Sequence, residues 1–222
     1  LINAATDRIF SLNLAGLNGK IVALDGMPLP TPRNYDILPL APAQRVDVIA
    51  DVVERLEIAT ATRGGLYPLG QIEARGETTP RIDPIPALLP NDLPRPGDVT
   101  QDLVLTMQGG AMGGRHGGDN IWAFNNLSDL QSSPFGRFQR GETARIRLVN
   151  DTSFPHAMHL HGHHFYEVER DGRRGDLRDT SLIAARATRD ILCVFDNPGK
   201  WMLHCHMLSH QVGGMKTWVE VL

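Results

Sequence analysis

The chain has 222 residues, and 22 Lys and Arg against 25 Asp and Glu give it a formal charge of −3, which indicates no basic surface for nucleic acid or anionic lipid. Hydrophobic residues make up 41% of the chain, but no apolar run reaches the roughly 18 residues that a membrane span needs. The composition therefore argues against nucleic-acid binding and against a membrane span, and it predicts a globular protein.

The first third of the chain alternates short apolar runs with turn residues. The 22 glycines and 15 prolines exceed their average share of roughly 12%, which favours short strands over long helices. Asp25-Gly26 is a strong signal for a hairpin turn. Several of the runs show the period-two alternation of a strand with one buried face. We therefore expect strands over residues 9–14, 21–24 and 44–50.

A proline-rich segment follows these strands. Six of the fifteen prolines lie between Pro80 and Pro96. Because proline cannot donate to a sheet and biases the residue before it to extended geometry, this segment is typical of a linker. We expect a first domain over residues 1–74, a linker over 75–99 and a second domain over 100–222.

The last part of the chain also reads as strands separated by turns. Residues 143–149 alternate apolar and polar side chains, as a strand with one solvated face does. Further strands are expected over residues 103–107, 121–124, 191–195 and 216–221. Short strands at this spacing predict an all-β fold, a Greek-key sandwich or barrel.

Histidines are concentrated in two segments of this second domain. Eight of the nine histidines lie between His156 and His210. Because successive side chains of a strand point to opposite faces, His204 and His206 are expected on one face and Cys205 on the other. By the same alternation His159 and His161 share a face, and His156 lies on the opposite side.

These two faces carry different sets of potential metal ligands. On one face the expected donors are two imidazoles, a thiolate and a thioether, from His156, His210, Cys205 and Met215. This is the ligand set of a blue-copper electron-transfer site, in which methionine is a weak axial ligand. The other face offers four imidazoles without a thiolate, which suit copper ions that react with oxygen. They belong to His159, His161, His204 and His206.

Two motifs make the pattern specific. His156 to Gly162 follows the pattern His-x-x-His-x-His-Gly, and His204 to Met215 follows His-Cys-His-x-x-x-His-x-x-x-x-Met. Together they resemble the carboxy-terminal copper motifs of the multicopper oxidases, the laccase-like family built of cupredoxin domains. Other segments resemble the second and third domains of that family, namely residues 1–5, 40–47, 178–180 and 196–201.

The resemblance implies a fold and a role for each ligand. The fold would be a cupredoxin-like Greek-key β-sandwich or barrel, with one complete domain over residues 100–222 and part of a second over 1–74. The type 1 copper would be held by His156, Cys205, His210 and Met215. The type 2 copper would be held by His159, and the type 3 pair by His161, His204 and His206. Electrons would pass from Cys205 along the backbone to its neighbours His204 and His206, and the location would be periplasmic or extracellular.

The family completes its trinuclear cluster with two further His-x-His pairs from an amino-terminal domain. Outside the two segments this chain has only His116, in a glycine-rich loop. We therefore expect the carboxy-terminal part of a laccase-like oxidase, with an amino-terminal cupredoxin domain, a small reducing substrate and O2 as partners. This oxidase would oxidise phenols, amines or metal ions and reduce O2 to water, whereas the chain alone would not reduce O2. The alternatives are a blue-copper electron-transfer or copper-binding module without oxygen chemistry, and a zinc-loaded or copper-free relic.

Four further residues are predicted to have structural roles. Cys193 lies in an apolar strand and is expected to be an inert buried thiol. His163 is expected to pack beside the ligand strand. For Asp179 and Asp190 the alternatives are to orient imidazoles or help deprotonate a phenolic substrate, and to form ordinary surface pairs with Arg178 or Arg189, of which the surface pairs are expected.

Overall fold

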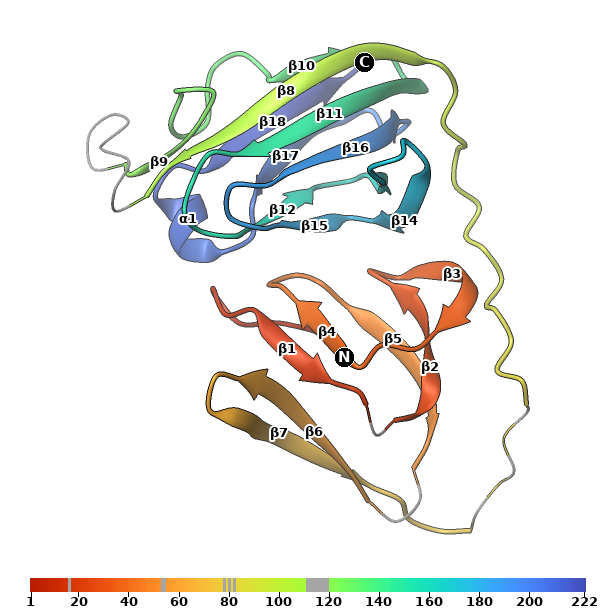
Figure 1. Ribbon diagram of the computed structural model, residues 1–222. Helices are drawn as coiled ribbons and strands as arrows, with labels where there is room; N and C mark the ends of the chain where they lie inside the picture. Colours follow the sequence, from red (N-terminus) through yellow and green to blue (C-terminus); the bar gives the residue numbers. More distant parts are fainter. Residues whose placement is uncertain (16, 53–54, 78, 80, 82, 111–119) are drawn as a thin grey trace. The chain divides into compact units, whose positions relative to one another are not determined.

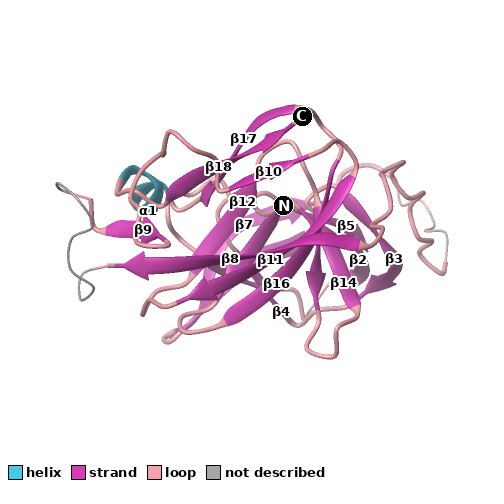
Figure 2. Ribbon diagram, turned by 90° about the horizontal axis from the view of Figure 1, so that it is seen from above, coloured by secondary structure: helices cyan, strands magenta, loops and turns pink. Residues whose placement is uncertain are grey.

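The computed structural model describes the whole chain except residues 16, 53–54, 78, 80, 82 and 111–119, so the loop around His116 lies outside the described residues (Figure 1). The regular secondary structure of the described part is almost entirely strand, with one five-residue helix (Figure 2). The all-β prediction is therefore confirmed. Within that part, no helix is long and apolar enough to cross a membrane. The chain divides into two compact units, Leu1–Asn91 and Asp92–Leu222.

The first unit contains two antiparallel sheets, with strand orders β4-β1-β6-β7 and β3-β2-β5. The strands are β1 (Phe10–Asn13), β2 (Asn18–Leu24), β3 (Met27–Arg33), β4 (Ile37–Leu40), β5 (Val46–Asp51), β6 (Arg55–Thr62) and β7 (Gly65–Glu73). Leu12, Ile21, Leu29 and Val46 come from both sheets and share one buried core. Between β2 and β3 the expected hairpin turn is present, because Asp25 and Gly26 both have positive φ, 51° and 78°.

The second unit contains a five-stranded sheet, β10-β18-β17-β12-β15, and a six-stranded sheet, β14-β13-β16-β11-β8-β9. Two neighbouring pairs, β8 with β11 and β10 with β18, are parallel, and the other pairs are antiparallel. The strands are β8 (Val99–Gly109), β9 (Trp122–Phe124), β10 (Gly136–Phe138), β11 (Glu142–Asn150), β12 (His156–Leu160), β13 (Phe165–Val168), β14 (Arg174–Arg178), β15 (Thr180–Ile183), β16 (Thr188–Phe195), β17 (Gly199–Cys205) and β18 (Lys216–Val221).

The two sheets of the second unit pack face to face. Phe138 of β10 stacks on Phe195 of β16, with ring centroids 3.7 Å apart. In β11, Ile146 and Leu148 are buried and Arg147 is exposed, which confirms the alternation predicted there. This closed core supports β12 and β17, the two strands that carry His156, His159, His204 and Cys205.

β12 and β17 are adjacent in the five-stranded sheet. Their antiparallel register places Met158 opposite Cys205 and His159 opposite His204. β17 ends at Cys205, and the chain then forms α1 (Leu208–Val212) before it returns as β18. Ligand candidates far apart in sequence therefore meet at one end of this sheet.

Between the end of β7 at Glu73 and the start of β8 at Val99, the described residues form no strand. Arg81 donates a hydrogen bond to the Asn18 carbonyl in the first unit, over 3.0 Å. At the other end, the Gly97 amide donates to the Thr143 hydroxyl in the second unit, over 3.0 Å. The division at residue 91 falls inside the segment predicted as a linker, and the assignment of residues 1–74 to a partial cupredoxin domain stays a prediction.

Candidate metal centre

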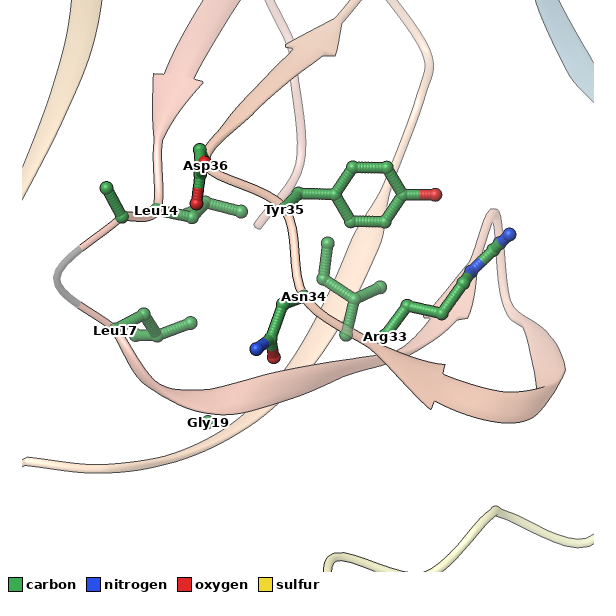
Figure 3. A pocket seen from close by; sticks show the side chains of 9 residues that line it. Leu14, Leu17, Gly19, Arg33, Asn34, Tyr35 and Asp36 are labelled. Atoms are coloured by element: carbon green, nitrogen blue, oxygen red, sulfur yellow. The ribbon is translucent and has the colours of Figure 1, made fainter.

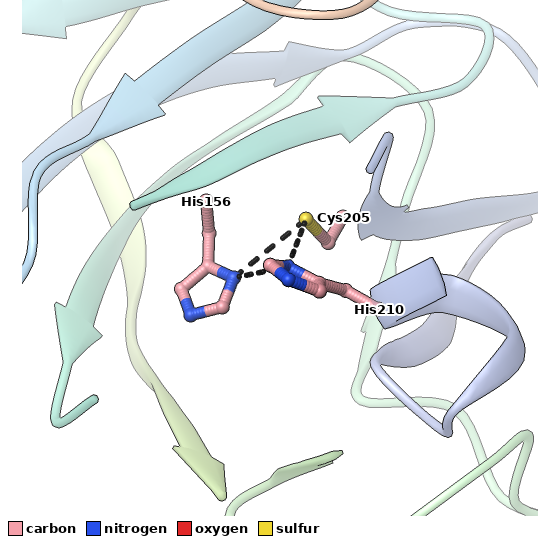
Figure 4. A group of neighbouring side chains, drawn as sticks. All are labelled: His156, Cys205 and His210. Carbon is pink, nitrogen blue, oxygen red and sulfur yellow. Dashed lines mark hydrogen bonds between the residues drawn. The ribbon is translucent and has the colours of Figure 1, made fainter. Parts of the chain in front are cut away.

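Three side chains converge at the end of β17 (Figure 4). His156 opens β12, Cys205 ends β17, and His210 lies in α1. The Nδ1 atoms of the two histidines are 3.0 Å apart, and the Cys205 Sγ lies 3.7 Å from His156 Nδ1 and 3.6 Å from His210 Nδ1. Three donor atoms, two nitrogens and one sulfur, therefore face one another across a space the size of a metal ion. The residues described by the structure contain no other comparably close group of three His, Cys, Asp or Glu side chains.

The environment of His156 keeps its imidazole neutral. The residue is fully buried, and this burial, with a smaller contribution from nearby His210, lowers its pKa to about 3. Its Nε2 lies 2.8 Å from the Thr152 hydroxyl, so its Nδ1 faces Cys205. A neutral imidazole with one nitrogen held by a hydrogen bond is the form in which histidine binds metals.

Met215 is joined to this cluster through the backbone. The residue is fully buried, its amide donates to the His210 carbonyl over 2.9 Å, and its carbonyl accepts from the Cys205 amide over 3.1 Å. The turn from Cys205 to Met215 is thus closed by its own hydrogen bonds. Two imidazoles and a thiol, with a buried methionine in the same turn, are donors that fit copper better than a hard, oxygen-preferring cation.

The four other predicted ligands gather as a second group. The ring of His159 lies 4.8 Å from that of His161, 5.7 Å from His204 and 5.6 Å from His206, measured between centroids. The Nε2 atoms of His161 and His204 are 3.0 Å apart. The structure therefore brings all four imidazoles together, and their division between type 2 and type 3 copper stays a prediction.

Three histidines of the second group also have lowered pKa values, which favours the neutral, metal-binding form. Burial lowers the pKa of His204 to about 4, against the opposing effect of its hydrogen bond to the Cys205 carbonyl. Burial likewise lowers the pKa of His161 and of His206. The Nδ1 of His206 is buried and has no hydrogen-bond partner in the described part of the chain. A nitrogen-only donor set with an unused ring atom fits copper ions here as well.

The two aspartates differ from their predicted roles. Asp179 is buried, and its carboxylate lies 3.6 Å from the His159 Nδ1, which also lies 3.0 Å from the Asp179 carbonyl. The prediction of a surface pair is therefore wrong for this residue. Asp190 accepts two hydrogen bonds from Arg147, because the register of β11 and β16 sets them directly opposite. Its predicted pairing with a sequence neighbour is also wrong.

The structural roles predicted for His163 and Cys193 are confirmed. His163 is buried between Phe195 and Trp201, and its Nδ1 lies 3.1 Å from the His161 carbonyl. Cys193 is fully buried, and desolvation raises its pKa. A thiol in this state is unreactive at neutral pH.

A small cavity in the first unit offers no comparable chemistry (Figure 3). Its volume is about 50 Å³, and its lining includes Leu14, Leu17, Arg33 and Tyr35. The Arg33 guanidinium lies over the Tyr35 ring, 5.6 Å from its centroid. Ligand pockets usually measure about 300 Å³ or more, so this cavity is a packing gap.

Comparisons with known proteins agree with this geometry. A family model described as "Multicopper oxidase" matches residues 98–222. The whole chain is 29% identical to the multicopper oxidase MmcO of Mycobacterium tuberculosis and covers 45% of that protein. Among solved structures, Lac15 from a marine microbial metagenome is 52% identical, with a TM-score of 0.83. The match covers the whole of this chain and 54% of the Lac15 chain. A multi-copper oxidase from Pseudomonas Thermotolerans is 25% identical, with a TM-score of 0.84 and the same coverage. The chain thus spans about half the length of these relatives.

Proposed function

Because this chain belongs to the multicopper oxidase family, we propose that it is the copper-binding carboxy-terminal part of a laccase-like oxidase. The complete enzyme would oxidise phenols, amines or metal ions and reduce O2 to water. The observation that carries the proposal is the convergence of His156, Cys205 and His210 beside a second group of four imidazoles. A periplasmic or extracellular location is part of the same proposal, by resemblance.

In this proposal each group of side chains holds copper. The type 1 ion would be held by His156, Cys205, His210 and Met215. The type 2 ion would be held by His159, and the type 3 pair by His161, His204 and His206. When bound, copper supplies one-electron oxidation of substrate at the first site and four-electron reduction of O2 at the second.

The chain itself supplies the connection between the two sites. Cys205 belongs to the first group, and the residues directly before and after it, His204 and His206, belong to the second. Because the three residues are joined by peptide bonds, β17 sets the separation of the sites and provides a short covalent path for electrons. Burial lowers the pKa of His156, His161, His204 and His206, so no proton must leave these four imidazoles at neutral pH before copper binds.

The second group provides only part of a trinuclear site. We propose that an amino-terminal cupredoxin domain with two His-x-His pairs supplies the rest. The relatives are about twice as long as this chain, which supports a further part of this kind. A blue-copper module without oxygen chemistry is a weaker candidate, because it would leave the four gathered imidazoles without a use.

Copper reconstitution tests the proposal. Adding Cu(II) to the chain should produce the intense blue absorption of a thiolate bound to copper, and Cys205→Ser should abolish it. Cys193→Ala is the matched control, because it removes the other cysteine and should leave the colour unchanged. A folded chain that stays colourless and binds no copper would overturn the proposal.

A further inference from the structure

An indole contacts both histidines of the first site. Trp122 opens β9, and only 4% of its surface is exposed. Its ring centroid lies 4.3 Å from that of His210 at an interplanar angle of 43°, and 5.1 Å from that of His156 at 83°. One side chain outside both histidine motifs therefore touches ligands from two separate segments.

The surroundings of Trp122 are shaped to hold a large aromatic ring. Phe154 meets it edge-on, with centroids 5.7 Å apart and an interplanar angle of 87°. A Cβ added to Gly110 or to Gly213 would lie 2.8 Å from the indole, which is too close for any side chain. Two glycines thus leave the space that the indole fills, and a smaller residue at position 122 would leave a void beside the histidines.

The backbone ties Trp122 to the turn that carries His210 and Met215. The Trp122 amide donates to the Gly213 carbonyl over 3.0 Å, and the Trp122 carbonyl accepts from the Ser128 hydroxyl over 2.7 Å. The indole is therefore anchored to the same turn whose side chains it contacts, and its position relative to that turn does not depend on side-chain packing alone.

We infer that Trp122 is a positioning residue that orients the imidazoles of His156 and His210 and keeps water from their side of the type 1 copper site, an inference that rests on the proposed function. Edge and tilted contacts on two rings restrict the rotation of both imidazoles about their side-chain bonds. A buried indole also makes the surroundings apolar, and the apolar shell of a metal site tunes its reduction potential. Trp122 would thereby adjust how readily the site accepts an electron from substrate.

Trp122→Ala and Trp122→Phe in the full chain test the inference, with Trp218→Phe as the matched control. The control indole lies on β18, where it donates to the Gln131 carbonyl and contacts Lys200. Trp122→Ala should release type 1 copper about tenfold more readily, as loss of outer ligand contacts commonly does. It should also shift the blue absorption band and lower the reduction potential, because water enters. Trp122→Phe should fall between the parent and Trp122→Ala, and the control should match the parent.

Equal copper retention, absorption band and potential in a folded Trp122→Ala and the parent would overturn the inference. If Trp122→Ala does not fold, Trp122→Phe provides the test. An absorption band and a reduction potential equal to those of the parent would then overturn the inference. A copper-free measurement separates this result from failure of the proposed function. In the NMR spectra of the apo chain, Trp122→Phe should shift or broaden the imidazole signals of His156 and His210 and leave those of His161 unchanged. Unmoved signals would refute the positioning role even if the parent bound no copper.

Discussion

The two faces of the β17 segment differ in how far their potential metal ligands are enclosed by the chain. On one face His156 and Cys205 are fully buried, and the turn from Cys205 to Met215 closes on itself through hydrogen bonds. On the other face His161 is exposed and His206 only half-buried. A site whose donors are enclosed by one unit can assemble on this chain alone, whereas an open group of imidazoles has room for ligands from elsewhere.

The largest expected effect is on oxygen consumption with a phenolic donor, which depends on the second group of imidazoles. We expect none from the isolated chain, because in the proposed function the open group would hold only part of a trinuclear site. Activity should appear only after addition of a partner carrying two His-x-His pairs, as measured with an oxygen electrode. Turnover by the copper-loaded chain alone would contradict the incompleteness of the second site.

Removal of one histidine from each face should separate the sites. His156→Ala should abolish the blue absorption, because it removes a proposed type 1 ligand, whereas His159→Ala should keep the colour and reduce the copper bound elsewhere on the chain. Absorbance and copper content per chain are the measurements. Loss of the colour in His159→Ala would show that the faces are wrongly assigned.

Two threonine hydroxyls, one beside each group of histidines, allow a matched comparison with a smaller expected effect. The Thr152 hydroxyl lies 2.8 Å from His156 Nε2, and the Thr180 hydroxyl lies 3.0 Å from His159 Nδ1. Replacing either threonine by valine keeps the shape and should cost about 1–3 kcal/mol in the free energy of unfolding. Thr152→Val should weaken copper at the first site about tenfold, whereas Thr180→Val should spare it. Copper titration monitored by the blue absorption band measures this difference. If both variants weaken copper binding equally, the separation of the two faces is contradicted.

The pH dependence of apo-chain stability tests the burial of one histidine on each face without any metal. The pKa of His156 falls from 6.5 to about 3 on folding, and that of His204 falls to about 4, so the unfolded chain binds more protons between these values. The stabilisation is present above pH 6.5 and is lost as the pH falls, by at most about 1.4 kcal/mol per pH unit for each imidazole. Urea unfolding between pH 7 and 5 should show this decline.

A glutamine variant on each face supplies the control for that decline. His156→Gln and His204→Gln should each reduce the slope of the free energy of unfolding against pH by the contribution of one imidazole. A decline that is unchanged in both variants would mean that other groups govern it.

The gathering of histidines could be predicted because it depends on local geometry. Alternation along a strand places Cys205 opposite to His204 and His206 whatever the rest of the fold is. The contacts of Trp122 and the burial of Asp179 depend on the packing of distant segments, and no pattern in the sequence signals them. Asp190 pairs with Arg147, 43 positions away, because of a strand register that neighbouring residues do not encode.

Some strands also cannot be predicted from the sequence pattern. β3 contains Pro28, Pro30 and Pro32, which argue against a strand, but it lies at the edge of its sheet, where missing amide donors are tolerated. β7 is exposed along its whole length and so lacks the alternation by which a strand is detected. In contrast, β11 and β18 alternate clearly and were predicted within one or two residues.

The alternation in β17 also limits how this segment can change in length. Side chains repeat every two residues along a strand, so one inserted residue exchanges the two faces for everything beyond it. An insertion between Cys205 and His206 would turn His206 toward the face of Cys205 and remove it from the group of four imidazoles. Single-residue insertions and deletions here should therefore damage both sites at once, so the triplet His204-Cys205-His206 can be altered by substitution but not by a change in spacing.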